Sequence, residues 1–307
     1  MAYEAKVILD SMGPNGARLT TFELSYPRFV HSELLTHRML GRNSASSRAI
    51  PPAKLIARVK EDPALPVFWG LNEPGMQASQ ELSEADQGVA KSIILGLRDR
   101  AIKEVEWLTK FTSVGEKLNG LHKQVANRYL EPWMFITVIV TATHYQNFFD
   151  LRDHAKAQPE LRDVAAKAHA LYKASEPTPV ADGEWHLPFV TGRDRDQLVQ
   201  AGYDDQHLCW ISVGRCARVS YLTHDGQRDP QADLTMGKQK MLENGHMSPL
   251  EHVARAMTEE RWRQYATIRS LDWVEKGIPV GNLWGWGQLR KDIAGEDVFS
   301  KLQRARS

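Results

Sequence analysis

Residues 18–38 read RLTTFELSYPRFVHSELLTHR, and the architecture we expect is built outward from this stretch. Residues 18–24 alternate apolar and polar side chains and contain the β-branched and aromatic residues typical of a half-buried strand. Pro27 stands where a helix places its first residue, and the apolar residues after it recur at helical spacing up to Leu35. We therefore predict a strand that leads directly into a helix.

A polar segment follows this helix. Residues 41–52 are rich in Arg, Asn and Ser and end at Pro51-Pro52, which disfavours helix for Ile50, so we expect a polar loop. Together with the end of the helix, the segment contributes a cluster of polar side chains: His37, Arg38, Arg42, Asn43, Ser44, Ser46, Ser47 and Arg48. Its guanidiniums could neutralise a phosphate dianion, and its hydroxyls could donate hydrogen bonds to the phosphate oxygens. The alternative is a solvated loop whose serines cap turns.

The rest of the chain alternates helical patterns with short apolar segments. Ser83 and Asp86 predict a capping box, and the apolar face of residues 89–108 is expected to pack in the core. Residues 133–142 are too few to span a bilayer and predict a buried segment, which is followed by a helix-prone run to residue 173. Beyond it we expect a Pro-rich linker at residues 175–192 and a short apolar segment at residues 209–222. A helix at residues 233–242 and a loop with a second helix at residues 245–262 should follow.

Composition excludes several classes of protein. The chain has 307 residues, enough for one large domain or two small ones, and 39 Lys and Arg against 38 Asp and Glu give a formal net charge of +1. That balance provides no overall field to attract nucleic acid or an anionic membrane, so an anion must be held by a local cluster. The first residues lack the apolar region of a signal peptide, and Cys209 and Cys216 form no disulfide framework. We expect a cytoplasmic protein, or one of the host cytoplasm if the chain is viral.

A second polar constellation is GHMSPLEH, residues 245–252. Ser248 followed by Pro249 is a typical helix start with Ser248 as the N-cap, which gives Glu251 a local structural role. Two histidines with a carboxylate suggest a metal, but their spacing matches no known ligand motif, so we expect no metal site. The sequence also lacks a P-loop, a strand-borne GxGxxG and a GxSxG elbow.

Both polar constellations resemble motifs of the flavin-dependent thymidylate synthases. The residues from His37 to Arg48 resemble the family signature, written RHRxxSxNExSxRY, and GHMSPLEH resembles its GHxSPFEH loop. Three further elements resemble family motifs: Asn147 with Leu151-Arg152 and the AQxE of residues 157–160, Arg128 with Pro132, and the ARVSY of residues 217–221, which matches a strand.

The order of these motifs differs from the order in the family. There the ARVS and GHxSPFEH elements precede the signature, whereas here they follow it. We infer a circular permutation in which the old ends are joined through the Pro-rich stretch, a change that compact domains with neighbouring termini tolerate. The expected organisation is one catalytic domain over residues 1–307, with the signature and helical part at 1–174, a joining segment at 175–208 and a permuted flavin-binding part at 209–307.

The resemblance implies an α+β fold, with a mixed sheet flanked by helices, and a homotetramer whose active sites lie between subunits. It implies transfer of a one-carbon unit from methylenetetrahydrofolate to C5 of a pyrimidine deoxynucleotide, most directly dUMP to dTMP, with FAD carrying hydride from NADPH and without a cysteine nucleophile. The implied catalytic residues are Arg152, His246 and Ser46. The implied nucleotide-binding residues are Ser46, Arg48, Arg128 and Arg152. The implied cofactor-binding residues are His37, Arg38, Asn43, Asn147, Ser220, Ser248 and Glu251.

Some positions depart from the family pattern, and several of these would lie on the nucleotide side. The departures are Glu33, Thr36, Gly41, Ser44, Ala49 and Lys156. Because the flavin-side matches are better kept, a dUMP or dCMP 5-hydroxymethylase, or a dCMP C5-methylase, stays an alternative. A nucleic-acid-binding module and a non-catalytic nucleotide binder are alternatives of other classes. Residues 281–290 (GNLWGWGQLR) match no family element and could line a nucleotide pocket or pack on the surface.

Overall fold

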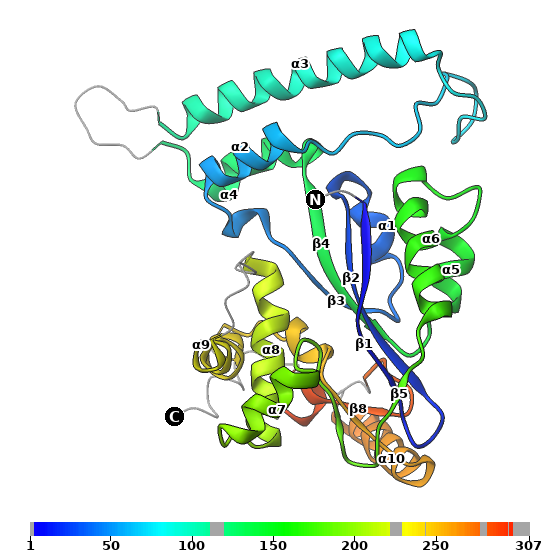
Figure 1. The fold of residues 1–307 in the computed structure, drawn as a ribbon, viewed down its shortest axis with the longest axis vertical. Coiled ribbons are helices and arrows are strands. Elements are labelled where there is room, and N and C mark those ends of the chain that lie inside the picture. The colour runs from blue at the N-terminus through cyan, green and yellow to red at the C-terminus, as the bar shows by residue number, and fades with distance from the viewer. Residues whose placement is uncertain are drawn as a thin grey trace.

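The computed structural model describes residues 3–110, 120–221, 229–242, 244–276, 281–293 and 295–296. Its centre is a five-stranded sheet in the order β3-β4-β2-β1-β5, and a smaller sheet has the order β6-β7-β8 (Figure 1). The strands are β1 (Glu4–Met12), β2 (Arg18–Pro27), β3 (Gly41–Ser44), β4 (Phe135–Ala142), β5 (Thr178–Pro179), β6 (Trp185–His186), β7 (Ala254–Ala256) and β8 (Trp286–Gln288).

Helices and short helical turns connect the strands. The α-helices are α1 (His31–Leu35), α2 (Pro52–Glu61), α3 (Glu84–Leu108), α4 (Lys123–Ala126), α5 (Gln146–Arg152), α6 (Pro159–Ala174), α7 (Gly192–Gln200), α8 (Asp205–Tyr221), α9 (Pro230–Thr235) and α10 (Glu259–Lys276). The 3₁₀ turns are η1 (Arg28–Val30), η2 (Ser47–Ala49), η3 (Asn127–Trp133), η5 (Ser248–Glu251) and η6 (Leu289–Asp292), and η4 (Met236–Met241) is π-helical. Of the helices in the described ranges, none has both the length and the apolar character to cross a bilayer.

β2 and β4 form the middle of the larger sheet. β2 pairs antiparallel with both β1 and β4, and β4 pairs antiparallel with β3. β5 runs parallel to β1, so the sheet is mixed. The predicted strand at residues 18–24 and the predicted buried segment at residues 133–142 are confirmed. The expected α+β class, with helices flanking a mixed sheet, is confirmed as well.

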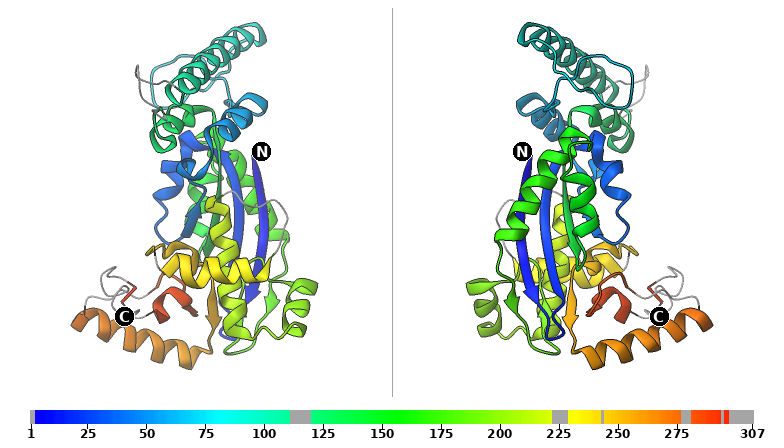
Figure 2. Two further views of the ribbon diagram at one scale, coloured as in Figure 1. Left: turned by 90° about the vertical axis from the view of Figure 1, so that its left-hand side faces the viewer. Right: turned by 90° about the vertical axis from the view of Figure 1, so that its right-hand side faces the viewer.

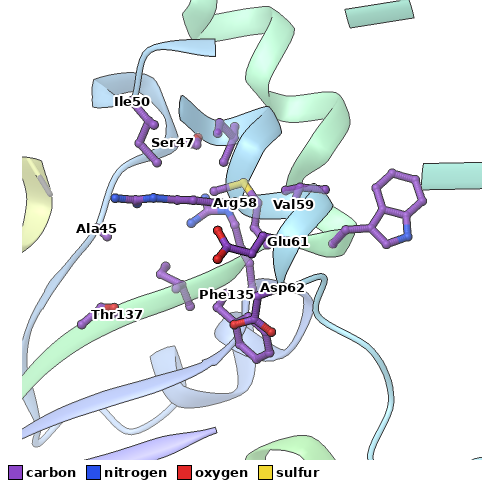
Figure 3. A pocket seen from close by; sticks show the side chains of 14 residues that line it. Ala45, Ser47, Ile50, Arg58, Val59, Glu61, Asp62, Phe135 and Thr137 are labelled. Carbon is purple, nitrogen blue, oxygen red and sulfur yellow. The ribbon is translucent and has the colours of Figure 1, made fainter. Parts of the chain in front are cut away.

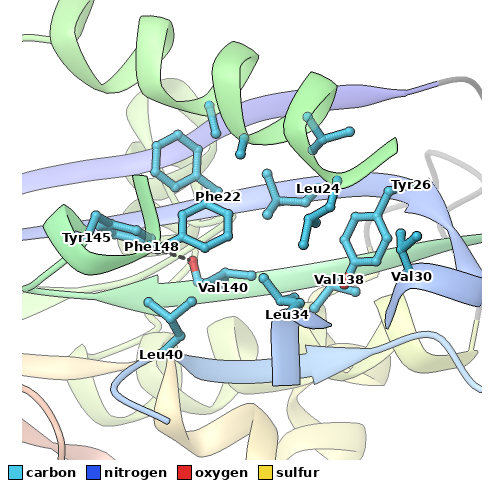
Figure 4. Packing of buried hydrophobic residues seen from close by; sticks show 14 of the residues in the cluster. Phe22, Leu24, Tyr26, Val30, Leu34, Leu40, Val138, Val140, Tyr145 and Phe148 are labelled. Atoms are coloured by element: carbon cyan, nitrogen blue, oxygen red, sulfur yellow. Dashed lines mark hydrogen bonds between the residues drawn. The ribbon is translucent and has the colours of Figure 1, made fainter. Parts of the chain in front are cut away.

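Helices cover this sheet from two sides (Figures 1 and 2). α1, α5 and α6 pack on one face, where Phe22 and Leu24 of β2 meet Val138 and Val140 of β4 in a buried core (Figure 4). The hydroxyl of buried Tyr145 donates a hydrogen bond to the carbonyl of Val140 (3.0 Å). α8 contacts β3 and β4 from the other side. The site described below lies where β3 meets α8.

α3 begins as predicted, but its apolar face is not buried along its whole length. The Ser83 hydroxyl caps the helix by accepting a hydrogen bond from the backbone N–H of Asp86 (3.2 Å). Val105, near the other end, is fully buried, whereas Val89 and Ile93 are each 60% exposed. The expectation that the whole face packs in the core is therefore wrong for the first half of the helix. That half extends beyond the body of the protein (Figure 1).

Four segments differ from their predicted structure. Residues 245–262, expected as a loop and a helix, contain the 3₁₀ turn η5 and the strand β7 before α10 begins at Glu259. Residues 217–221, for which the family resemblance implied a strand, form the last turns of α8, and residues 208–217 of this helix are buried without a break. Residues 41–44, expected as part of a loop, form the edge strand β3, because their backbone groups pair with the edge of β4. Residues 175–192, expected as a linker, contain β5 and β6, which pair with β1 and β7 and so connect the two sheets.

A chain of buried hydrogen bonds joins the two sheets. His186 of β6 lies between the hydroxyls of Ser11 and Thr21, with Nδ1 and Nε2 each 2.8 Å from its partner. The Thr21 hydroxyl contacts that of Thr141 (2.7 Å), which contacts Nδ1 of His252 (2.8 Å). Burial lowers the pKa of both histidines to about 3; for His186 the charge of His252 adds to the effect. Both rings are therefore neutral in the folded protein at neutral pH.

Acid should therefore destabilise the protein through these two histidines. In the unfolded chain a histidine has a pKa of about 6.5, so below that pH the unfolded state takes up protons that the folded state does not. We expect the free energy of unfolding to fall as the pH decreases from about 6.5 towards 3, by up to about 1.4 kcal/mol per pH unit for each histidine. Urea unfolding, followed by circular dichroism at several pH values, measures this slope.

The double variant His186→Gln/His252→Gln is expected to show a shallower pH dependence than the parent. His154→Gln removes an exposed histidine of the same chain and should leave the slope unchanged. A double variant that keeps the parental slope would show that other groups govern the acid sensitivity.

Candidate functional site

A cleft of about 450 Å³ opens beside β3, and we call it the Arg48 cleft. Its polar lining comes from two parts of the chain. The segment after α1 contributes Arg42, Asn43, Ser44, Ser46 and Arg48, and the GHMSPLEH loop contributes His246 and Ser248. The fold thus brings the two predicted polar constellations into one site.

Asn43 holds these two segments together. Its side chain is buried in β3, where Nδ2 donates a hydrogen bond to the carbonyl of Cys216 in α8 (2.8 Å). The hydroxyl of Ser248 donates to Oδ1 of Asn43 (3.3 Å), although the two residues are 205 positions apart in the sequence. Ser248 was expected to cap an α-helix; instead it is the first residue of the 3₁₀ turn η5 and makes no side-chain capping bond. The Asn43 amide therefore has a clear structural role in the wall of the cleft.

Arg48 and Ser46 provide the best anion-binding group in the cleft. Arg48 lies in η2 and is exposed, and Ser46 precedes that turn and is half-buried. Within the described ranges, no carboxylate forms an ion pair with Arg48. A guanidinium beside a hydroxyl offers charge-assisted hydrogen bonds to a phosphate. His246 lies in the lining of the same cleft, where its exposed ring can contact a bound molecule.

Gly41 allows the GHMSPLEH loop to approach β3 closely. A Cβ at this position would lie 3.3 Å from the carbonyl oxygen of Thr141 and 3.5 Å from side-chain atoms of Glu251. The family signature that this segment resembles has Ser here. Glycine at position 41 therefore fits this structure, because the close contacts there leave little room for a side chain.

Arg152, by contrast, is not among the residues that line the Arg48 cleft. It ends α5 and donates hydrogen bonds to the carboxylate of Glu33 (2.5 Å), to Nε2 of His37 (2.9 Å) and to the hydroxyl of Thr36 (3.1 Å). Glu33 and Thr36 are both departures from the family pattern. Two residues that differ from the family pattern therefore bind the guanidinium of Arg152, which the resemblance assigns to the pyrimidine nucleotide.

His37 positions Arg152. Its ring is buried and packs edge-to-face against Phe148, with the ring centroids 5.2 Å apart. Burial, and then the charge of Arg152, lower the pKa of His37, while a hydrogen bond with the side chain of Asn147 raises it. The net shift is downward, so the imidazole is neutral at pH 7 and can accept the hydrogen bond from Arg152.

Five other predicted residues do not line the cleft or cannot be placed. Asn147 is exposed on α5, and neither it nor Glu251 is part of the lining. Arg128 is exposed and donates a hydrogen bond to the carboxylate of Glu131 (2.7 Å). Arg38 is exposed on the turn that follows α1. Neither residue lines the Arg48 cleft. The backbone of Ser220 belongs to α8, but its side chain lies outside the described residues.

The C-terminal run, residues 281–290, packs on the GHMSPLEH loop. Arg290 forms an ion pair with Glu251, and the side-chain amide of Gln288 donates a hydrogen bond to the Glu251 carbonyl (3.1 Å). Burial raises the pKa of Glu251, and the charge of Arg290 opposes this. Trp286 is buried and donates from its indole to the carbonyl of Ala17 (3.1 Å). Most of the run is buried or partly buried and contacts the GHMSPLEH loop, whereas Trp284 is exposed, and none of its residues lines the cleft.

His122 and Gln124, which no sequence motif marks, also line the cleft. His122 precedes α4, where its Nδ1 accepts a hydrogen bond from the backbone N–H of Gln124 (3.3 Å). Met241 of η4 and Ala217 of α8 complete the wall. No local pattern marks these residues, because they reach the cleft through the packing of α4 on η2 and of η4 on α8.

The two cysteines lie in α8, away from solvent. Both thiols are free and buried, and burial raises their pKa above the usual range. A thiolate is the reactive form of cysteine, so this environment disfavours nucleophilic attack by either residue at neutral pH.

Comparison with known proteins gives distant structural likenesses alone. No family model and no curated protein sequence matches the chain. The structure of a UMP/dUMP methylase PolB from Streptomyces cacaoi bound with 5-Br UMP is 14% identical, with a TM-score of 0.44, over 56% of this chain and 88% of that one. The same enzyme bound with 5-Br dUMP is 19% identical, with a TM-score of 0.40, over 51% of this chain and 67% of that one. Likeness of this degree establishes neither family nor function.

The Glu251–Arg290 pair can be tested by a double-mutant cycle. Arg290→Met leaves a partly buried carboxylate without its counter-charge, and we expect a loss of about 1–3 kcal/mol in the free energy of unfolding. The side chains are 21% and 28% exposed, so the loss should be smaller than for a fully buried pair. Urea unfolding of Arg290→Met, Glu251→Gln and the double variant gives the coupling energy. Strictly additive single losses would show that the pair contributes nothing.

Proposed function

We propose that this protein transfers a one-carbon unit from methylenetetrahydrofolate to C5 of a pyrimidine mononucleotide, with dUMP as the first candidate substrate, FAD as prosthetic group and NADPH as reductant. The observation that carries the proposal is the convergence of two separate motifs in the Arg48 cleft. Ser46 and Arg48 of the signature-like segment share it with His246 and Ser248 of the GHMSPLEH loop. Resemblance of two short stretches does not by itself require that they meet in space, so their meeting is independent support.

The cleft offers separate groups for the parts of a nucleotide. Arg48 and Ser46 would hold the phosphate, because a charged fork and a hydroxyl together satisfy several of its oxygens. His246 lines the same cleft and would hold or move a proton during transfer at C5. Fixing the phosphate orients the base relative to His246, and orientation accounts for much of the rate enhancement in reactions between two bound molecules.

The residues of the cleft also fit a flavin nucleotide. The Arg42 guanidinium and the hydroxyls of Ser44 and Ser248 form a donor set that suits a pyrophosphate. Arg42 donates from Nη1 to the carbonyl of Leu35 (2.7 Å), which fixes its guanidinium at the end of α1. When bound, FAD would supply the hydride that reduces the transferred carbon to a methyl group.

Motif order adds a further part of the proposal. The chain would be a circularly permuted relative of the flavin-dependent thymidylate synthases, working as a homotetramer with Arg152 of one subunit near the cleft of another. β5 and β6, in the stretch that would join the old ends, pair with β1 and β7. Such a connection would keep the two parts of the permuted domain together.

A second candidate reaction is favoured by the surroundings of Arg152. Its guanidinium is bound by Glu33 and Thr36, which differ from the family pattern at the place assigned to the pyrimidine. A changed environment for the base fits either dCMP as the acceptor or a 5-hydroxymethyl product. In the latter case water, rather than hydride, adds to the transferred carbon, and no reductant is consumed.

One experiment distinguishes these reactions. The purified chain is incubated with FAD, NADPH and methylenetetrahydrofolate, and with dUMP or dCMP in separate reactions, and the nucleotide is weighed by mass spectrometry. A gain of one CH₂ on dUMP is the expected result, and a gain of CH₂O shows the hydroxymethyl outcome. A protein that neither binds FAD nor changes the mass of either nucleotide would contradict the proposal.

Arg48 should be needed for nucleotide affinity. Removing a charge-assisted phosphate contact with Arg48→Ala is expected to weaken binding of dUMP by about tenfold or more. Isothermal titration calorimetry measures the affinity. Arg162→Ala, which removes an exposed arginine of α6, is the matched control and should leave the affinity unchanged. Equal affinities for Arg48→Ala and the parent would place the phosphate elsewhere.

A further inference from the structure

A second cavity, of about 420 Å³, lies between α2 and the beginning of β4, and we call it the α2 cavity. Its walls are mainly apolar and include the buried side chains of Ile50, Leu55, Val59 and Met134. Figure 3 shows Arg58 and Glu61 of α2 directed into the same space. The size falls within the range of small-molecule sites, and the combination of apolar walls with a few polar groups is typical of them.

The α2 cavity is separate from the Arg48 cleft, although the two share a wall. Between the end of β3 and η2, Ala45 and Ser47 line the α2 cavity, whereas Ser44, Ser46 and Arg48 line the Arg48 cleft. From Ser44 to Ser46 the backbone is extended, and its two-residue period directs successive side chains to opposite faces; Ser47 and Arg48 belong to the 3₁₀ turn η2 and also line different cavities. A molecule in one cavity therefore faces the back of the wall that forms the other.

The two arginines of the α2 cavity differ in their partners. Arg28 forms an ion pair with Glu131 (3.0 Å), so its charge is balanced. Within the described part of the chain, no ion pair joins Arg58 to a carboxylate, and burial lowers its pKa. A half-buried guanidinium among apolar side chains is costly unless an anion compensates its charge.

Acidic groups limit what the anion can be. Glu61 and Asp62 follow Arg58 at the end of α2 and also line the cavity. They would repel a ligand with several negative charges, such as a polyphosphate. A ligand with one anionic group can place that group on Arg58 and its apolar body against Leu55, Val59 and Met134.

We propose that the α2 cavity is a second binding site, distinct from the nucleotide cleft, for a small amphipathic molecule with an apolar, ring-containing or branched body and a single anionic group. Arg58 recognises the anionic group. The apolar side chains of α2 and of residues 134–136 hold the body. The hydroxyls of Ser47 and Thr137 provide additional hydrogen-bonding positions in the lining.

Two fluorescent probes of nearly the same shape test this assignment. 8-Anilinonaphthalene-1-sulfonate carries an apolar body and one anionic group, and N-phenyl-1-naphthylamine has the same rings without the charge. Titration into the purified full chain should show saturable binding of the sulfonate at one site. Arg58→Gln should weaken binding of the sulfonate by about tenfold and leave that of the uncharged amine within about twofold. Arg58→Lys, which keeps the charge, should recover part of the affinity.

Lys54→Gln is the matched control, because it removes an exposed cation from the same helix outside the cavity lining. It should leave both affinities unchanged, and so should Arg48→Ala in the nucleotide cleft. No saturable sulfonate binding, a sulfonate affinity indifferent to Arg58→Gln, or an equal loss for both probes would overturn the assignment. Full displacement of the sulfonate by dUMP would also overturn it, because the α2 cavity would then belong to the nucleotide site.

Discussion

The buried chain of hydrogen bonds from Ser11 through His186, Thr21 and Thr141 to His252 fixes how the C-terminal part of the protein sits on the central sheet. A buried hydroxyl or imidazole without a partner is costly, so these four hydrogen bonds favour the observed placement of β6 and of the GHMSPLEH loop, although Nε2 of His252 has no hydrogen-bond partner among the described residues. The apolar contacts around the network could tolerate small shifts; the hydrogen bonds cannot. This constraint places the loop against β3, and the candidate site depends on that placement.

β3 has two roles because its side chains alternate between faces. Asn43 points to α8 and the GHMSPLEH loop and connects them, while the residues that follow separate two cavities of similar volume. One cavity offers an exposed guanidinium and hydroxyls to a phosphate, and the other offers a half-buried guanidinium among apolar side chains. Under the two proposals, arginine would serve two kinds of recognition on either side of one segment, and the surroundings of each guanidinium would decide which.

Local patterns predicted those elements whose residues show a polar and an apolar side. The alternation of residues 18–24 gave a strand, and Ser83 with Asp86 marked a helix start. The strand expected at residues 217–221, where the structure has the end of α8, rested on the family resemblance and not on a pattern. Reasoning from local patterns was wrong elsewhere. It failed for residues 41–44, since a polar edge strand has the composition of a loop and is recognised by its partner β4. It also placed Val89 and Ile93 in the core, because spacing predicts a helical face but not what covers it.

By itself, the sequence determined which chemical groups are available, namely the guanidiniums and hydroxyls of residues 37–48 and the polar groups of the GHMSPLEH loop. It also showed that the common glycine-rich nucleotide-binding loops are absent. The tertiary structure alone decided which of the available groups act together. It joined Ser46 and Arg48 to His246, engaged Arg152 with Glu33, and added His122 and Gln124, which no motif marks. The physical reason is that contacts between residues many positions apart depend on strand order and helix packing, which a local pattern does not encode.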